Sequence, residues 1–166
     1  PSDDSVLSGR AVDRTVRPLF NSRMRNEVQV ITTVLSFDGE NDTDLVAMIA
    51  ASAALTLSDI PWAGPIGAVR VGLTEEGFIL NPKKAERSGS KLDLLVSGTH
   101  DKINMIEAGA QEITEEQMGA AFEFAFESIQ KITDFITSVQ AEVGKSKREA
   151  ALLVGSAPFE AAIRSW

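Results

Sequence analysis

Five arginines lie within the first 26 residues, and three of them, Arg10, Arg14 and Arg17, are spaced by four and three positions. If this segment is helical, the spacing places the three guanidinium groups along one stripe. A guanidinium group is permanently charged and its planar donors fit phosphate oxygens, so such a stripe can follow a nucleic-acid backbone. The same side chains can instead pair with Asp13 and with carboxylates elsewhere as a solvated face. Both interpretations are open at this point.

The other side chains that could do chemistry are weaker candidates. His100, the single histidine, lies beside Asp101 in a short polar turn, and nothing orients a serine towards it, so a Ser-His-Asp triad is not indicated. One histidine also excludes a multi-histidine metal site. The carboxylates between residues 38 and 44 miss the positions and the terminal glutamate of a calcium loop. A solvated turn followed by a helix cap accounts for them better.

The arginine stripe requires a helix over residues 5–17. Pro18 should end it, because proline lacks an N–H and disfavours the helical conformation in the preceding residue. Residues 27–36 are rich in β-branched side chains and predict a strand that is partly buried on both faces. The alanine-rich residues 43–57 predict a well-buried helix, with Asp42 or Thr43 able to cap its first turn.

The second half of the chain predicts two pairs of strands. Residues 66–73 and 77–80 indicate a hairpin around the turn at 74–76. Residues 92–97 and 102–108 each carry apolar side chains on either side of a polar turn, and they predict two further strands.

The longest predicted helix covers residues 114–143. Thr114 and Gln117 can form a capping box at its start, and Gly144 stands where a left-handed cap belongs. Its apolar face is defined by residues at spacings of three and four: Met118, Phe122, Ala125, Ile129, Ile132, Ile136, Val139 and Val143.

The composition is that of an ordinary globular protein. The chain has 166 residues, of which 43% are apolar and 24% charged, and it has no cysteine and hence no disulfide. With 16 basic and 24 acidic residues its formal charge is −8, so any binding of nucleic acid must be local. Residues 1–26 differ, because five arginines against three aspartates give them a net charge of +2. No apolar run approaches the roughly 20 residues that span a bilayer, and we expect a cytoplasmic protein with no membrane partner.

Several motifs in one order resemble the first core domain of the bacterial polynucleotide phosphorylases. The resemblance covers about residues 1–143, and the segments that carry it are Ser8-Gly-Arg-Ala-Val-Asp-Arg-Thr-Val-Arg-Pro-Leu-Phe20, Asn26-Glu-Val-Gln-Val30, Ala47-Met-Ile-Ala-Ala-Ser-Ala-Ala-Leu55, Gly64-Pro-Ile-Gly-Ala-Val-Arg-Val-Gly72, Ile79-Leu-Asn-Pro82, Ser90-Lys-Leu-Asp-Leu94 and Gln117-Met118. It implies an α/β fold of the ribonuclease PH type (ribosomal protein S5 domain 2-like), with a mixed, largely antiparallel sheet packed with helices.

The resemblance also implies how the chain is divided. We expect residues 1–143 to be the C-terminal part of the first ribonuclease PH-like core domain, and residues 144–166 to be a linker and the start of an all-helical connecting domain. The chain starts without methionine and ends abruptly on Ile163-Arg164-Ser165-Trp166, which is typical of a fragment. By the same resemblance, the N-terminal strands of the core domain, with their arginine-bearing loop, are missing.

The activity that the resemblance implies is phosphate-dependent 3′-to-5′ degradation of single-stranded RNA, including mRNA, with release of nucleoside diphosphates. The parent enzyme would be a polyribonucleotide nucleotidyltransferase that uses Mg²⁺ and inorganic phosphate. Its expected partners are RNA, two further copies in a homotrimeric ring, and the second core domain and KH and S1 modules of its own chain.

Within that family this domain is expected to be non-catalytic. Active ribonuclease PH domains hold phosphate with a Gly-Gly-Thr-Arg loop at a helix start, where this chain has residues 41–44, with two aspartates and no arginine. Active domains also place two carboxylates for a metal ion, and here the first position is Asn81 and only Asp93 remains, as a possible relic. We therefore expect no catalytic or metal-binding residue and no cofactor here, and RNA contacts at Arg10, Arg14 and Arg17.

A second interpretation belongs to a different class. The chain can be a structural, catalytically inactive subunit of a ribonuclease PH-like ring, or a stand-alone interaction domain. The residues that follow it in the intact gene would distinguish the two, because a second core domain with the phosphate loop and both aspartates supports the enzyme and a stop codon supports the alternative.

Overall fold

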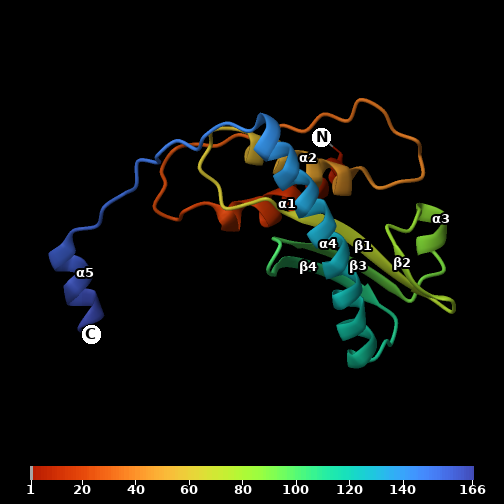
Figure 1. The fold of residues 1–166 in the computed structure, drawn as a ribbon. Coiled ribbons are helices and arrows are strands. Elements are labelled where there is room, and N and C mark those ends of the chain that lie inside the picture. Colours follow the sequence, from red (N-terminus) through yellow and green to blue (C-terminus); the bar gives the residue numbers. More distant parts are fainter. Residues whose placement is uncertain (1) are drawn as a thin grey trace.

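The computed structural model describes residues 2–166 and has three layers, with helices on both faces of one sheet (Figure 1). The four strands are antiparallel in the order β2-β1-β3-β4, so the predicted α/β fold with a largely antiparallel sheet is confirmed. The elements are α1 (Asp3–Val16), the 3₁₀ turn η1 (Arg17–Leu19), α2 (Thr43–Leu57), β1 (Gly67–Thr74), β2 (Gly77–Leu80), α3 (Lys84–Arg87), β3 (Leu92–Gly98), β4 (Ile103–Ala110), α4 (Glu115–Val143) and α5 (Ala157–Arg164).

The central strands are buried on both faces because helices cover both. On β1, Val69 and Val71 point towards α4, while Ala68 points towards α1 and α2. On β3, which pairs with β1, Leu94 joins the α4 side and Leu95 the opposite side. This accounts for the near-continuous apolar sequence of both strands, since each face of the sheet needs its own apolar set.

The long helix α4 begins as the sequence predicts. Thr114 and Gln117 form a reciprocal capping box, with Gln117 N–H donating to Thr114 Oγ1 at 3.1 Å and Thr114 N–H donating to Gln117 Oε1 at 3.0 Å. Its fully buried side is the row Ala121, Ala125, Ile129, Thr133 and Ile136, whereas Met118, Phe122 and Ile132 are only partly buried. The predicted face is therefore shifted by part of a turn, which leaves Val143 exposed.

Helix α4 lies close to β1, and a glycine makes this approach possible. A Cβ atom added at Gly67 would lie 2.9 Å from the carbonyl oxygen of Ile129 and 3.1 Å from Cβ of Ile132. The predicted left-handed cap at Gly144 is wrong, because Gly144 has φ −69° and ψ 152° and the chain leaves α4 in an extended conformation. Its N–H still donates to the Gln140 carbonyl at 2.8 Å.

Helix α1 is tied to the sheet and to the loop after α2 by buried polar contacts. The hydroxyl groups of Thr15 and Ser97 lie 3.0 Å apart, and the indole N–H of Trp62 donates to the Val16 carbonyl at 3.0 Å. The first helix ends at Val16, one residue earlier than expected, and Pro18 lies in the 3₁₀ turn that follows. These contacts fix which side of α1 faces solvent.

The predicted strand at residues 27–36 is wrong. This segment is extended but pairs with no strand among residues 2–166, and residues 29–37 are exposed. A β-branched strand needs a neighbouring strand to satisfy its backbone groups, and none lies beside this segment in the described part of the chain. The adjacent surface of α2 is apolar as well: Val46 is 65% exposed there, beside a groove of about 900 Å³.

After α4 the basic linker turns back to the C-terminal end of α2. Lys147 Nζ donates to the carbonyl oxygens of Leu55, Thr56 and Ser58 at 2.7 to 3.0 Å, so it caps the C-terminal end of α2. Burial lowers the pKa of Lys147. Beyond this contact the chain reaches α5, which stands apart from the sheet and buries none of its residues (Figure 1).

Candidate functional site

Arg10 and Arg14 lie on the solvent side of α1, and Arg17, the first residue of η1, continues the same side. The helix buries Ala11, Val12, Thr15 and Val16, so positions 10, 14 and 17 share the opposite side and are exposed. The predicted helical placement of the three guanidinium groups is therefore present. Whether they contact RNA stays a prediction.

The three arginines differ in the ion pairs that they make within the chain. Within residues 2–166 the Arg10 guanidinium has no ion-pair partner, and that of Arg14 lies 3.7 Å from a carboxylate oxygen of Glu107 on β4, with both side chains more than half exposed. Arg17 is held by Asp13, because its Nη2 donates to both carboxylate oxygens at 2.7 Å. Arg10 and Arg14 are thus the members of the stripe that are available to an external phosphate, while Arg17 is already paired.

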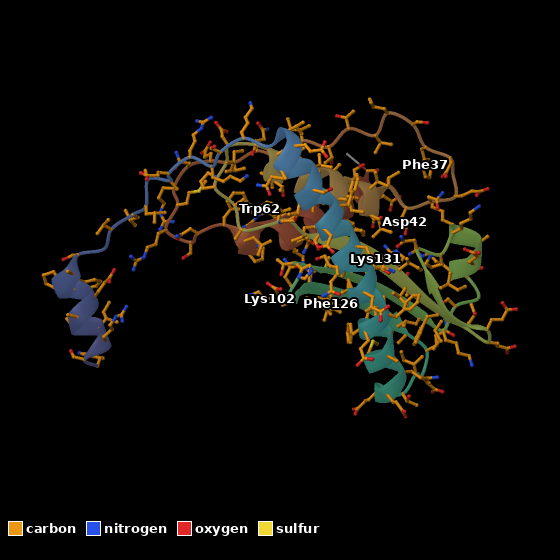
Figure 2. All side chains as sticks on the ribbon, viewed as in Figure 1. Phe37, Asp42, Trp62, Lys102, Phe126 and Lys131 are labelled. Carbon is orange, nitrogen blue, oxygen red and sulfur yellow. The ribbon has the colours of Figure 1, made fainter. Side chains whose placement is uncertain are left out.

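A second charged cluster lies at the N-terminal end of α2, and we call it the ionic cluster. It consists of Arg70 on β1, Arg87 on α3, Asp93 on β3, and Asp42 and Asp44 at the start of α2 (Figure 2 labels Asp42). The side chains of Arg70 and Asp42 are 11% and 13% exposed. Ion pairs therefore join four elements, α2, β1, α3 and β3.

The Arg70 guanidinium is the centre of the ionic cluster. Its Nη1 donates to Asp93 at 2.5 Å and its Nη2 to Asp44 at 3.2 Å. Its Nε lies 2.8 Å from Asp42 Oδ2 but is not aligned for a hydrogen bond, so that contact is an ion pair only. Arg87 completes the cluster, with Nη1 donating to Asp42 at 2.7 and 2.9 Å and Nη2 to Asp93 at 2.7 Å.

The protonation of the ionic cluster follows from these contacts. Burial by itself raises the pKa of Asp93, but the hydrogen bonds from Arg70 and Arg87 outweigh burial and hold that pKa below its usual range. Burial by itself lowers the pKa of Arg70, and the hydrogen bond and charge of Asp93, with the charges of Asp42 and Asp44, raise it overall. The contact between Arg70 and Asp93 therefore favours the charged form of both side chains.

The positions of a metal pair do not fit Mg²⁺ in this domain. Both carboxylate oxygens of Asp93 accept hydrogen bonds from arginines. At the other position, the side-chain oxygen of Asn81 accepts the Arg70 backbone N–H at 2.9 Å. Mg²⁺ needs oxygen ligands that are free to coordinate. Here two positively charged guanidinium groups already bind the carboxylate oxygens of Asp93. Asp93 was expected to be a possible relic of a metal site. In this structure it binds two arginines and joins β3 to β1 and α3.

The acidic residues before α2 play several roles instead of one solvated turn. Asp38 accepts the backbone N–H groups of Asn41 and Glu40, which lower its pKa to about 2. Glu40 pairs with Lys83 at 2.6 Å. Asp42, one of the two predicted capping residues, is the N-cap residue of α2, but its side chain makes no capping bond because it faces the two arginines.

Sequence reasoning missed Arg70 and Arg87. A charged residue within the apolar run of β1 was the available signal for Arg70, since a buried charge requires a partner. No comparable signal marks Arg87 in the sequence. The turn at His100 is as expected: its ring lies 3.2 Å from Asp101 and 3.5 Å from Asp134 and is exposed, with no serine among its contacts in the described part of the chain.

Among residues 2–166 no helix combines the length and apolar character that crossing a membrane requires. In the same residues no three carboxylate or histidine side chains are arranged so that they could hold a metal ion together.

Two family models match most of the chain. Residues 1–61 match domain 1 of the 3′ exoribonuclease family, and residues 64–128 match domain 2 of the same family. The border falls between α2 and β1, so the first match covers the helices of one face and the second covers the sheet and the first half of α4.

Curated relatives and a solved structure agree with these models. The chain is 48% identical over 166 residues to a polyribonucleotide nucleotidyltransferase of Alkaliphilus oremlandii, and 50% identical over 149 residues to that of Finegoldia magna. These matches cover 100% and 90% of this chain but only 24% and 21% of the relatives, so the chain spans about a quarter of their length. Rice Rrp46 has the same fold, with a TM-score of 0.64 at 18% identity over 84% of this chain and 66% of that chain.

Proposed function

The chain belongs to the 3′ exoribonuclease family, and from this premise we propose that it is the first, non-catalytic core domain of a polynucleotide phosphorylase. In that protein it contributes RNA binding and ring assembly, and the parent enzyme degrades RNA from the 3′ end with inorganic phosphate and releases nucleoside diphosphates. The observation that carries the non-catalytic role is the ionic cluster, because it brings two aspartates, and no free arginine, to the helix start where active domains hold phosphate.

The rest of the proposal follows from the resemblance to the polynucleotide phosphorylases, and the greater length of the relatives leaves room for the further domains. Residues 1–143 form the core domain, and residues 144–166 form a linker and the start of a helical connecting domain. Catalysis, Mg²⁺ and phosphate belong to the second core domain, and KH and S1 modules and a homotrimeric ring complete the cytoplasmic enzyme. The alternative, an inactive ring subunit or a stand-alone interaction domain, predicts a chain without a second core domain.

The 166-residue chain should release no ADP from oligo(A) in the presence of phosphate and Mg²⁺. The reason is that Arg70 and Arg87 are neutralised by carboxylates and that Asp93 has no free oxygen for a metal ion. Chromatography of the nucleotides after incubation measures the result. If ADP is released, and Asp93→Asn abolishes the release, the domain is catalytic and the proposal fails.

The exposed arginines should contact RNA through phosphate charge and not through base identity. For single-stranded nucleic acid, the slope of log affinity against log salt is about −0.7 per phosphate neutralised. In the full-length protein, Arg10→Ala or Arg14→Ala should flatten this slope by about that amount, weaken binding to every RNA sequence alike, and shorten processive runs. Arg17→Ala should have a smaller effect, since Asp13 already pairs with Arg17.

Arg164→Ala serves as the matched control, because Arg164 is an exposed arginine on α5, apart from the stripe. It should leave the slope unchanged. If Arg10→Ala and Arg14→Ala lower thermal stability or trimer content and the slope stays as in the wild type, the arginines belong to the scaffold and the RNA assignment is wrong.

A further inference from the structure

The basic segment that follows α4, residues 145–148, lies against the C-terminal end of α2, and we call it the latch. The Lys145 N–H donates to the Leu57 carbonyl at 2.9 Å, and Lys147 Nζ reaches three carbonyl oxygens of the same turn at 2.7 to 3.0 Å. A charged donor makes a stronger hydrogen bond than a neutral one, and a cation suits the negative end of a helix dipole. The latch is therefore bonded to the end of α2 through both lysines.

Arg148 extends the latch to the loop that follows α2, residues 58–66. Its backbone N–H donates to the Asp59 carbonyl at 2.8 Å, and its Nε donates to Asp59 Oδ2 at 2.5 Å. The Arg148 side chain is exposed, so this ion pair alone stabilises little. The backbone bond of Arg148 and the three bonds of Lys147 therefore do most to hold the latch on the loop.

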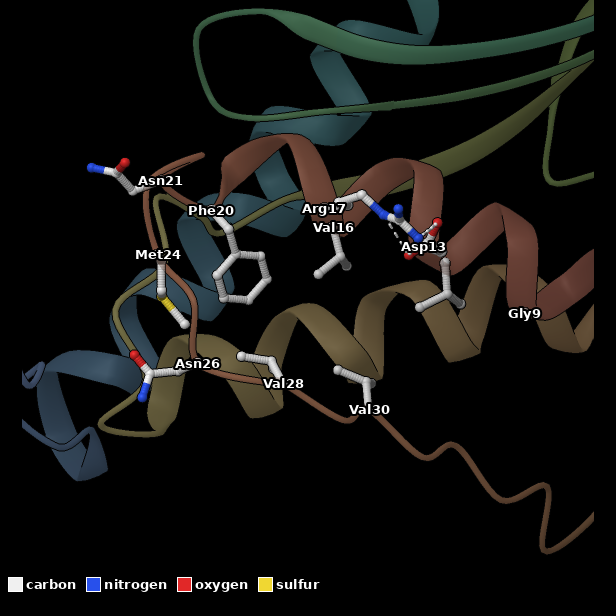
Figure 3. A pocket seen from close by; sticks show the side chains of 11 residues that line it. Gly9, Asp13, Val16, Arg17, Phe20, Asn21, Met24, Asn26, Val28 and Val30 are labelled. Atoms are coloured by element: carbon white, nitrogen blue, oxygen red, sulfur yellow. Dashed lines mark hydrogen bonds and ion pairs between the residues drawn. The ribbon is translucent and has the colours of Figure 1, made fainter. Parts of the chain in front are cut away.

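The same loop also holds the C-terminal end of α1. The Ala63 N–H donates to the Leu19 carbonyl at 3.0 Å, and the indole N–H of Trp62 donates to the Val16 carbonyl at the same distance. The ring centroids of Phe20 and Trp62 lie 6.3 Å apart. Figure 3 shows Val16 and Phe20 pointing from this end of α1 towards α2. The loop is therefore bonded to the latch near its start and to the end of α1 a few residues later.

From these contacts we propose that the latch couples the path of the chain beyond α4 to the position of α1. Only Ile60 and Pro61 separate Asp59 from Trp62, and the proline ring fixes one backbone angle between them. A displacement of the latch is therefore transmitted through the loop to Trp62 and so to the end of α1. Coupling between distant parts of a protein is carried by such chains of hydrogen bonds and packed side chains.

The coupling has a consequence for the arginine stripe. Arg14 lies in the last turn of α1, and Arg17 follows directly in η1. A domain attached beyond the latch can therefore change the position of the stripe by pulling on residues 145–148. This consequence rests on the RNA binding proposed above, whereas the coupling itself does not.

The latch should open without unfolding of the core. All four of its residues are exposed, whereas Trp62 at the other end of the coupling is buried. Segments with exposed hydrogen bonds and few buried contacts open locally, and hydrogen exchange of their amides reports this opening. The backbone amides of Arg148 and Ala63 therefore report the two ends of the coupling.

The test measures hydrogen exchange in the full-length protein by mass spectrometry that resolves these two amides. Lys147→Met keeps most of the length of the side chain and removes its three hydrogen bonds. It should speed exchange at Arg148 by about tenfold, the order expected when a charged hydrogen-bonding group is lost. Exchange at Ala63 should rise by about threefold, near the lower end of measured couplings. Exchange in the central strand β3 should be unchanged.

Two further variants complete the test. Lys131→Met is the matched control, because Lys131 is an exposed lysine on α4 away from the latch (Figure 2), and it should change neither amide. Asp59→Ala removes the partner of Arg148 and should speed exchange at Ala63 in the same direction as Lys147→Met, but by less. If Lys147→Met also speeds exchange throughout β3, the milder Asp59→Ala decides by the same comparison.

Two results would overturn the proposal. In the first, the Arg148 amide of the wild type exchanges as fast as in an unstructured chain, so that the latch does not form. In the second, the variants speed exchange at Arg148 and leave Ala63 unchanged, so that the latch holds the linker without acting on α1. Neither measurement involves RNA, so failure of the coupling is distinguishable from failure of the salt-slope test of Arg10 and Arg14.

Discussion

Replacing Arg70 by methionine should lower the free energy of unfolding by about 3–5 kcal/mol, measured by urea unfolding of the 166-residue chain at pH 7. Methionine keeps much of the volume of arginine but removes its charge. Asp42, Asp44 and Asp93 would then face one another with only Arg87 to balance them, and breaking a buried ion pair on one side costs about that much.

Arg10→Met is the matched control for Arg70→Met. Arg10→Met removes an exposed arginine without an ion pair among residues 2–166 and should change the free energy of unfolding by no more than about 0.5 kcal/mol. A loss of less than about 1 kcal/mol in Arg70→Met would mean that water already reaches the ionic cluster and screens it.

The pH dependence of the unfolding free energy should also reflect the ionic cluster. The pKa of Asp93 is lowered in the folded chain, because hydrogen bonds from Arg70 and Arg87 outweigh the effect of burial. A carboxyl group of this kind stabilises the fold above its unfolded pKa of about 3.9, and that contribution is lost as the pH falls through the folded value. The difference in unfolding free energy between wild type and Arg70→Met should therefore shrink below about pH 4.

Replacing Ile129 by alanine should cost about 2–5 kcal/mol of unfolding free energy. Ile129 is 0% exposed in the middle of α4 and lies against the sheet, so the substitution removes buried methyl groups and leaves a cavity. Because β1 approaches this point closely at Gly67, the backbone has little freedom to collapse into the space. Thermal and urea unfolding of the variant measure the loss.

Phe135→Ala is the matched control for Ile129→Ala. Phe135 lies on the same helix and is larger than isoleucine, but it is 68% exposed. Its removal should cost less than about 0.5 kcal/mol, since little apolar surface returns to water. If the two variants unfold alike, α4 does not pack on the sheet as described.

Elements whose partners are local were predictable from the sequence. The capping box at Thr114, the hairpin around residues 74–76 and the alanine-rich α2 depend on residues close to one another along the chain, and each is present. The strand at residues 27–36 depends on a partner elsewhere, and the β-branched side chains alone could not reveal that none lies beside it within residues 2–166.

The contacts of Asp42 in the ionic cluster likewise could not be predicted from local sequence. Asp42 or Thr43 was predicted to cap α2 from its position at the start of that helix, which is a local interaction. Two arginines that arrive from β1 and α3 compete for its carboxylate, and they prevail because a charged donor binds a carboxylate more strongly than a backbone N–H does. Such competition depends on tertiary structure, which spacing along the chain does not encode.

The unpaired extended segment at residues 27–36 has a consequence for handling the chain. Val30, Ile31, Val34 and Leu35 are exposed together, at 37% to 94%, on a backbone with no strand beside it in the described residues. An exposed, β-branched, uncharged edge is a template on which identical segments of other molecules can stack. Concentrated solutions should therefore form cross-β aggregates that bind thioflavin T, and Val34→Lys, which places a charge in the middle of the segment, should delay their appearance.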